Sequence, residues 1–400
     1  MYSTLIKNSA VLLVFFVFLA LKSNAQIQLS QEAQISILTC SKGDDLYNTF
    51  GHTAIRVKDP VANLDLVFNY GMFSFGGDSF KDQAEFGIKF IRGKLEYWLG
   101  VENFDNFLSH YKYDKRWVFE QVLNLNHEQK THLIEALSIN IKAENRYYRY
   151  DFFFDNCSSR VRDILEDALG PVFGKEEDTI HLATKQSFID LIDPYIKNKP
   201  WLDFGMDIML GLPSSRKASK YEFMFLPYHL KTQISAANKL VVSESYLASF
   251  PERDIEKNEF HWFTPFQLFS LILVLVSLLS YKNYKLQKHS FFLDYILLFI
   301  SGFFGCLFVF MWFGTEHLPA HANLNMFWAF PLNIVALFFV KKEKFASYFK
   351  LCAALASFIL LAWFLSPQQY HLAIIPLSLI YLVRYAKLLS YYEQKSSHVD

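Results

Sequence analysis

The residue types most suited to chemistry in this sequence are a cysteine at the start of a predicted helix and a histidine at the start of a predicted strand. Cys157 follows Asn156 and precedes an apolar stripe that stops at Gly170, so it is expected at a helix N-terminus. The partial positive charge at a helix start stabilises a thiolate, and a basic neighbour lowers the thiol pKa further. With His52 as that neighbour, the pair would suit acyl transfer through a thioester.

His52 is expected to lie on one of two paired strands. Gly51 precedes it and would allow another backbone to approach closely. A tight turn after this strand would pair residue 52 with about residue 71, which puts Asn69 diagonally across on the same face. Asn69 could then orient the imidazole, as the third member of a thiol acyl-transfer site does. Two aspartates are alternatives for this third position, Asp151 and Asp155.

Two plainer interpretations of Cys157 stay open. It could be an unreactive buried thiol, or it could form a disulfide with Cys40, because thiols outside the cytoplasm are readily oxidised. The other two cysteines, Cys306 and Cys352, fall within apolar stretches, where a small apolar role is expected.

The segments around these residues predict an α+β domain built on an antiparallel meander. Strand-like runs at 35–40, 53–57 and 64–75 are separated by turn residues. Apolar residues at helical spacing predict a helix over 128–142, with Asn126 as its cap.

The N-terminus predicts export of this domain. Lys7, an apolar run over 10–21 and Ser23-Asn24-Ala25 form the parts of a secretory signal peptide, assigned to residues 1–25. An uncleaved anchor is the alternative. Either way, residues 26–260 are expected outside the cytoplasm.

Residues 261–400 predict an all-α membrane domain. Five apolar stretches have about the length that crosses a hydrocarbon core. Lysines follow the first and third stretches and the last, whereas the loops 314–325 and 366–369 contain neither Lys nor Arg. Basic loops stay in the cytoplasm, so the C-terminus is predicted to be cytoplasmic. The stretches are about 263–281, 291–313, 326–340, 348–365 and 370–385.

Composition excludes some functions. Lys and Arg number 39, and Asp and Glu also number 39, so the chain has no net charge to favour a nucleic acid. We find no metal-type cysteine pair and no glycine-rich phosphate loop, and we therefore expect neither a metal nor a cofactor.

Three segments carry a resemblance to known proteins. Residues 49–57 around His52, Phe68-Asn69-Tyr70-Gly71 and 155–160 around Cys157 resemble a circularly permuted papain-type domain related to NlpC/P60, in which the His precedes the Cys. With the spans that follow, the chain resembles the Lnb-type lipoprotein N-acyltransferases. Further segments share this likeness: 201–205, 211–213, 225–227 and 317–325.

The resemblance implies acyl transfer in two steps at the periplasmic face of the inner membrane. His52 would deprotonate Cys157, which takes an acyl chain from a phospholipid. The chain then passes to the α-amine of the lipid-modified N-terminal cysteine of a lipoprotein. The implied partners are thus a phospholipid donor, a lipoprotein acceptor and the bilayer.

The resemblance also implies residues that hold the substrates. The aromatic run 147–154 could form the wall of an acyl slot, or it could simply be core packing. Backbone N–H groups at the start of the Cys157 helix could bind the oxyanion, with Tyr47 as a further candidate. The polar loop at 317–325 could position a substrate, or could merely meet headgroups and water. The expected substrate-binding residues are Tyr47, Tyr70, Asn156, Arg160, His317, Asn323 and Asn325.

Two rival functions remain at this stage. A membrane-anchored cysteine amidase or peptidase acting on peptidoglycan would use the same thiol and imidazole, but it would need at most one anchor. A non-enzymatic envelope sensor would instead join Cys40 to Cys157 in a disulfide and pass a signal through the spans.

Overall fold

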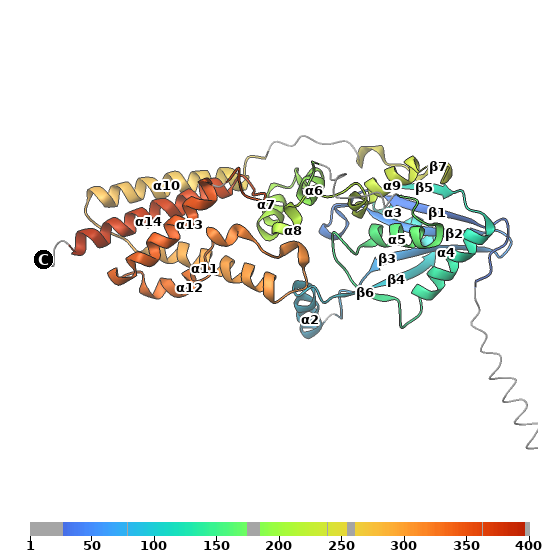
Figure 1. The fold of residues 1–400 in the computed structure, drawn as a ribbon, viewed down its shortest axis with the longest axis horizontal. Coiled ribbons are helices and arrows are strands. Elements are labelled where there is room, and N and C mark those ends of the chain that lie inside the picture. The colour runs from blue at the N-terminus through green and yellow to red at the C-terminus, as the bar shows by residue number, and fades with distance from the viewer. Residues whose placement is uncertain are drawn as a thin grey trace, which may run out of the picture.

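The computed structural model describes residues 27–77, 79–173, 185–237, 239–253, 261–361 and 363–396. Figure 1 shows two parts, a sheet domain (27–253) and a helical domain (261–396), with helix α2 (Phe80–Ile91) placed between them. This α+β architecture followed by long helices agrees with the prediction. The predicted signal peptide, residues 1–25, lies outside the described residues.

The sheet domain is built on a seven-stranded antiparallel sheet with the strand order β6-β4-β3-β2-β1-β5-β7. Its centre is the predicted meander of β1, β2 and β3. The strands are β1 Gln34–Cys40, β2 His52–Asp59, β3 Leu64–Met72, β4 Glu96–Asn103, β5 Val118–Leu123, β6 Tyr147–Arg149 and β7 Val241–Ala248.

The pairing of β2 with β3 has the register that the sequence suggested. Ile55 lies opposite Phe68, and continuing this register places His52 opposite Gly71. β3 ends at Met72, earlier than the predicted residue 75, and its pairing with β4 shifts between residues 69 and 72. Gly71 has φ +91°, a conformation that favours glycine and interrupts a regular ladder.

Alternate residues of the sheet enter two separate cores, because successive side chains point to opposite faces. On one face, Ile55 packs with Val161 of α5 and Leu133 of α4. On the other face, Ala54 packs with Phe107 of α3. The predicted helix at 128–142 is α4, and Asn126 caps it as expected. These helices are α3 Phe104–Tyr113, α4 His127–Asn140, α5 Cys157–Leu169 and α9 Pro227–Ala236.

Short helices lead from the sheet domain toward the helical domain. Part of the aromatic run is core here, because Phe153 packs against Phe188 and Phe225. These elements are η1 Leu46–Asn48, α6 Phe188–Ile196, α7 Pro200–Met209, α8 Leu212–Ser215, η3 Glu222–Phe225 and η4 Pro251–Arg253.

Among the described residues, the helical domain has four helices long and apolar enough to cross a membrane. The third predicted stretch, 326–340, differs from expectation because it is a series of short helical turns. Pro331 lies within it, and proline lacks the N–H and the space that a continuous helix needs. The helices are α10 Pro265–Lys285, α11 Phe292–Phe313, α13 Ala346–Leu361 and α14 Ile374–Ser396, with η5 Leu318–Ala320, η6 Leu324–Phe327, α12 Asn333–Ala336, η7 Leu337–Phe339 and η8 Glu343–Phe345 between them.

The two domains are joined by direct backbone contact. Gly211 donates its N–H to Pro319 O at 2.8 Å, and a β-carbon at Gly211 would lie 1.9 Å from His321 O. Ser215 Oγ also accepts the N–H of Gln369 at 3.0 Å. The junction is therefore closely packed, and it places the loops 314–325 and 366–369 against the sheet domain.

Candidate active site

Helix α5 begins with a closed capping box that fixes its first residue, Cys157. Asn156 Oδ1 accepts the N–H groups of Ser158 and Ser159 at 2.8 and 2.9 Å. Its Nδ2 donates to Phe152 O and Phe225 O at 2.7 and 2.9 Å. Since its amide is fully engaged, Asn156 positions the helix start and has no free group for a substrate.

His52 and Cys157 form a hydrogen-bonded pair. His52 is the first residue of β2, and Cys157 is the first residue of α5, which lies across that strand. The Cys157 side chain is buried at 8% exposure. The thiol and imidazole that the sequence singled out, 105 positions apart, are therefore in direct contact.

The pair shifts toward thiolate and imidazolium. Burial by itself raises the pKa of Cys157, but the charge and hydrogen bond of His52 outweigh it, with help from the Thr53 N–H and the Ser158 hydroxyl, so the thiol pKa lies below its usual value. Burial alone would lower the pKa of His52, yet contacts with Cys157 and Asn69 leave it above its usual value. Each member stabilises the charged form of the other.

Asn69 lies against the imidazole of His52, and its role as the third catalytic residue stays a prediction. His52 Nε2 donates to Asn69 Oδ1 at 2.5 Å, which leaves Nδ1 to face the thiol. Asn69 Nδ2 in turn donates to Glu102 Oε1 at 3.4 Å, and this fixes which side of the amide faces His52. Of the alternatives, Asp151 accepts the N–H groups of Phe153 and Phe154, and Asp155 pairs with Arg160.

Gly51 allows the strand that carries His52 to start where it does. Its φ is +84°, and a β-carbon there would lie 2.7 Å from Cys40 O. The close backbone approach that the sequence suggested is thus that of β1.

Cys40 and Cys157 are both free thiols, so the disulfide alternative is wrong. The two thiols differ sharply in environment. Burial raises the pKa of Cys40 to about 12, and a protonated thiol is a poor nucleophile. The environment of Cys40 therefore disfavours the thiolate, whereas that of Cys157 favours it.

Asn156 already accepts two of the N–H groups at the start of α5, where the sequence predicted an oxyanion site. The amides of Ser158 and Ser159 are already bound by Asn156, which leaves the Cys157 N–H as the donor at the helix start. Tyr47 is 65% exposed, and its hydroxyl donates to Asp45 at 3.0 Å.

Tyr148 offers an oxyanion donor that the sequence did not reveal. Its hydroxyl is buried and has no hydrogen-bond partner among the described residues. A β-carbon at Gly71 would lie 3.9 Å from that hydroxyl and 3.7 Å from Cys157 Cβ, so the hydroxyl lies close to the nucleophile. The pairing of Tyr97 in β4 with Tyr148 in β6 brings it there, and such long-range pairing leaves no local signal in the sequence.

Two other predicted substrate residues contribute to the surroundings of the site. Tyr70 is buried at 2% exposure, and its hydroxyl accepts from Asn140 at 2.8 Å. Arg160 binds both oxygens of Asp155, at 2.5 and 2.7 Å, and its guanidinium lies 3.8 Å from the centre of the Tyr148 ring. Both residues shape the wall around Tyr148.

The predicted residues of loop 317–325 lie at the domain junction. Asn323 and Asn325 are buried and donate to Ile208 O at 2.7 and 3.3 Å. His317 instead lies at the surface, with Nε2 2.9 Å from Phe90 O of α2. The structure therefore separates a structural pair from a surface histidine, and substrate binding by this loop stays a prediction.

Two further features lie apart from the reactive pair. A cavity of about 410 Å³ opens behind Asn69, on the side of α3, and is lined by neither Cys157 nor His52. Among the described residues, one cluster of three carboxylates is close enough together to hold a metal ion. It consists of Asp193, Asp203 and Asp207 on α6 and α7. Burial, together with the charges of Asp203 and Asp193, raises the pKa of Asp207 to about 8.

The chain is thus an α+β domain with a thiol–imidazole pair, joined to a bundle of apolar helices that are long enough to cross a membrane. Family comparisons give this class a name. The model of the Lnb N-terminal periplasmic domain matches residues 22–186, and that of the Lnb transmembrane domain matches residues 255–396. The chain therefore belongs to the Lnb family, as the resemblance predicted, and is a multi-pass inner-membrane protein with a periplasmic N-terminal domain. Comparison with curated proteins and with solved structures finds no match.

Proposed function

We propose that this protein is a lipoprotein N-acyltransferase that carries the acyl chain on Cys157. The observation that supports this proposal best is the hydrogen-bonded pair of Cys157 and His52, with the thiol pKa lowered and the imidazole pKa raised. A poised thiolate beside an imidazolium is the arrangement that thioester chemistry needs.

In the first step, the Cys157 thiolate attacks an ester carbonyl of a phospholipid. The carbonyl oxygen becomes an oxyanion, for which the Cys157 N–H and the Tyr148 hydroxyl are the proposed donors. The C–O bond to glycerol then breaks, and the His52 imidazolium gives its proton to the leaving oxygen. The products are a thioester on Cys157 and a lysophospholipid.

In the second step, the α-amine of a lipoprotein's lipid-modified N-terminal cysteine attacks the thioester. His52, now neutral, takes a proton from the amine. The C–S bond breaks, an amide forms, and the thiolate and imidazolium are restored. Asn69 holds the ring so that the same nitrogen serves both steps.

The arrangement of the helical domain supports a periplasmic site and a cytoplasmic C-terminus. The loops without Lys or Arg, 314–325 and 366–369, are the ones that contact the sheet domain. The lysine-bearing segments lie at the other end, where Lys395 pairs with Glu343 at 2.6 Å. Positive loops remain in the cytoplasm, so both bilayer-anchored substrates would meet Cys157 at the outer face.

The free thiols count against the sensor alternative, which required a disulfide. A peptidoglycan amidase would use the same pair, and the two enzymes differ in their products. We expect cells that lack any other N-acyltransferase to carry N-acylated lipoproteins when they express this protein. Mass spectrometry of lipoprotein N-termini would measure the modification.

Matched variants make this experiment specific. Cys157→Ser and His52→Ala should remove the N-linked chain while full-length protein accumulates. Cys40→Ala, a change at the unreactive thiol, and His127→Ala, at an exposed histidine, should leave the chain in place. Lipoproteins that stay fully modified with Cys157→Ser, or a changed muropeptide profile with unmodified lipoproteins, would overturn the proposal.

A further inference from the structure

A row of aromatic rings begins beside the nucleophile. The site of a Gly71 β-carbon lies 3.7 Å from both Cys157 Cβ and Tyr150 Cε2, so the Tyr150 ring borders the space next to the thiol. Tyr150 stacks on Tyr97 with centroids 4.4 Å apart, and Tyr97 contacts Phe73 at 5.3 Å. The first rings of the row are thus in contact from the site outward.

The row continues from the segment after β3 onto α2. Phe73 contacts Phe75 at 4.9 Å, and Phe75 contacts Phe86 at 5.5 Å. Phe86 then stacks with Phe90 at 6.1 Å. We call these six rings, Tyr150, Tyr97, Phe73, Phe75, Phe86 and Phe90, the aromatic path. Its inner rings, Tyr150, Tyr97 and Phe73, are half-buried, whereas Phe75 and Phe90 nearer its outer end are 54% and 48% exposed.

Helix α2 exposes an apolar face beside the end of this path. Phe80 is 90% exposed and Ile88 59%, and both lie on one side of the helix with Ile91. The opposite side carries charged residues, among them Glu85 and Lys89, which form an ion pair. A short amphipathic helix with large exposed apolar side chains is suited to a membrane surface, and such a patch is unusual on a surface that faces water.

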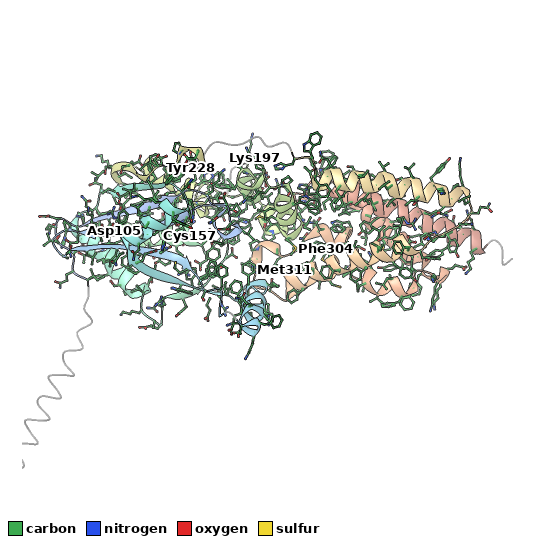
Figure 2. The ribbon with its side chains drawn as sticks, turned by 180° about the vertical axis from the view of Figure 1, so that it is seen from behind. Asp105, Cys157, Lys197, Tyr228, Phe304 and Met311 are labelled. Atoms are coloured by element: carbon green, nitrogen blue, oxygen red, sulfur yellow. The ribbon has the colours of Figure 1, made fainter. Side chains whose placement is uncertain are left out.

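The place of α2 identifies what covers this face. Glu316 N–H donates to Arg92 O at 3.0 Å, and His317 contacts Phe90 O. These residues follow the end of α11, a helix able to span the membrane. Figures 1 and 2 both show α2 between the sheet domain and the end of α11, the latter labelled in Figure 2 by Met311, with Cys157 on the sheet-domain side. Its apolar face is therefore at the level where the bilayer ends.

We propose that α2 lies in the outer surface of the bilayer and that the aromatic path guides a phospholipid acyl chain from there to Cys157. The inference rests on the proposed acyl transfer for its second half. Burial of Phe80, Ile88, Phe90 and Ile91 in the bilayer stabilises the contact, because each of these large apolar side chains is removed from water. Arg92, an exposed residue directly after α2, suits a lipid phosphate.

The contact with lipid is tested without reference to catalysis. A photoreactive phenylalanine analogue is placed at position 88 of the full-length protein in phosphatidylethanolamine and phosphatidylglycerol vesicles. The control position is 139, an isoleucine of α4 that is 51% exposed and lies on the sheet domain away from the long helices. Lipid adducts at 88 and not at 139 are expected, and equal labelling or no labelling at 88 would overturn the membrane contact.

The route to the thiol is tested by comparing two acyl donors. Ile88→Gln combined with Ile91→Gln should slow acylation of Cys157 from vesicle phospholipid at least tenfold, and so should Phe75→Ser. Each variant should retain acylation by a water-soluble short-chain ester at close to the original rate. Val61→Gln combined with Ile139→Gln, at exposed apolar positions of the sheet domain, is the matched control.

The outcomes separate this inference from the function on which it rests. If unaltered protein takes no acyl chain from phospholipid, the proposed function fails. If it does, and the α2 and Phe75 variants use phospholipid at the original rate, the acyl route is wrong while the proposed function stands. Equal losses with both donors would mean that the substitutions disturb the site itself, and this would also overturn the route.

Discussion

Thr53 and Ser158 join their hydroxyls at 2.9 Å, and each directly follows one member of the reactive pair, His52 or Cys157. Both hydroxyl residues are fully buried. The contact therefore ties the start of β2 to the start of α5 at the point where the imidazole meets the thiol. This hydrogen bond therefore helps to hold His52 and Cys157 close together, although they are far apart in the sequence.

Ser158→Ala should lower the stability of the fold and raise the pKa of Cys157. It leaves the Thr53 hydroxyl buried without its partner, which costs about 1–3 kcal/mol. It also removes a hydrogen bond that lowers the pKa of Cys157. Thermal unfolding and the pH midpoint of thiol alkylation measure the two effects. Adding Thr53→Val should recover part of the stability but not the midpoint, and strictly additive losses of stability would argue against the coupling.

The alkylation of Cys157 should depend on His52 in a defined direction. With the pair intact, the thiolate persists as the pH falls below the usual thiol range near 8.5, because the thiol pKa is lowered. In His52→Ala the largest effects that oppose burial are lost, so the alkylation midpoint should move upward. Acyl transfer needs the imidazolium too, and should also decline as the pH rises through the raised pKa of His52.

Iodoacetamide labelling across pH, with Cys40→Ala as the background, would measure this midpoint. An unchanged midpoint in His52→Ala would show that the imidazole does not activate the thiol.

Tyr148→Phe should slow acylation of Cys157 without changing the reactivity of its thiol toward alkylation. The hydroxyl is proposed to meet the oxyanion, and loss of one such donor costs about 10²–10³ in rate. Thiol alkylation develops no carbonyl oxyanion, so its rate and pH midpoint should stay the same. Stability should be kept or slightly raised, because a buried hydroxyl without a hydrogen-bond partner is removed. Acylation at the original rate would exclude Tyr148 from the oxyanion site.

Gly51→Ala should disturb the site through the backbone. A β-carbon would come within 2.7 Å of Cys40 O at a φ of +84°, and the left-handed conformation alone costs about 1–2 kcal/mol. His52 should shift, and both stability and thiol reactivity should fall. Gly205→Ala, where no atom lies within 4 Å of the new β-carbon, is the control and should be neutral or stabilising in helix α7. Similar behaviour of the two variants would contradict the close approach at Gly51.

The core of the site could be predicted because its signals are local. Capping residues before Cys157, the glycine before His52 and the short β2–β3 turn each act within a few residues, and together they set the register that brings Asn69 to the imidazole. The third apolar stretch, 326–340, shows where prediction from hydropathy fails. Hydropathy measures composition and does not show how strongly Pro331 interrupts a helix.

What the sequence did not reveal depends on long-range packing. Tyr148 reaches the site through pairing of β6 with β4, strands that are separated by about 50 residues. The sequence around the short helix α2 gives no sign of a membrane contact. The position of α2 follows from its contacts with Glu316 and His317, more than 200 residues later in the chain. Asn323 and Asn325 likewise connect the two domains through hydrogen bonds to Ile208 O, a contact between segments that are far apart in the sequence.

The central claim is that Cys157 carries the acyl chain. The most direct measurement is intact-protein mass spectrometry of the full-length protein after incubation with phospholipid vesicles, without a lipoprotein acceptor. We expect a mass increase of one acyl chain on Cys157. Hydroxylamine should remove it, an added acceptor lipopeptide should take it up, and Cys157→Ala should lack it. Unmodified Cys157 alongside transfer to the acceptor, or an acyl chain on another residue, would contradict it.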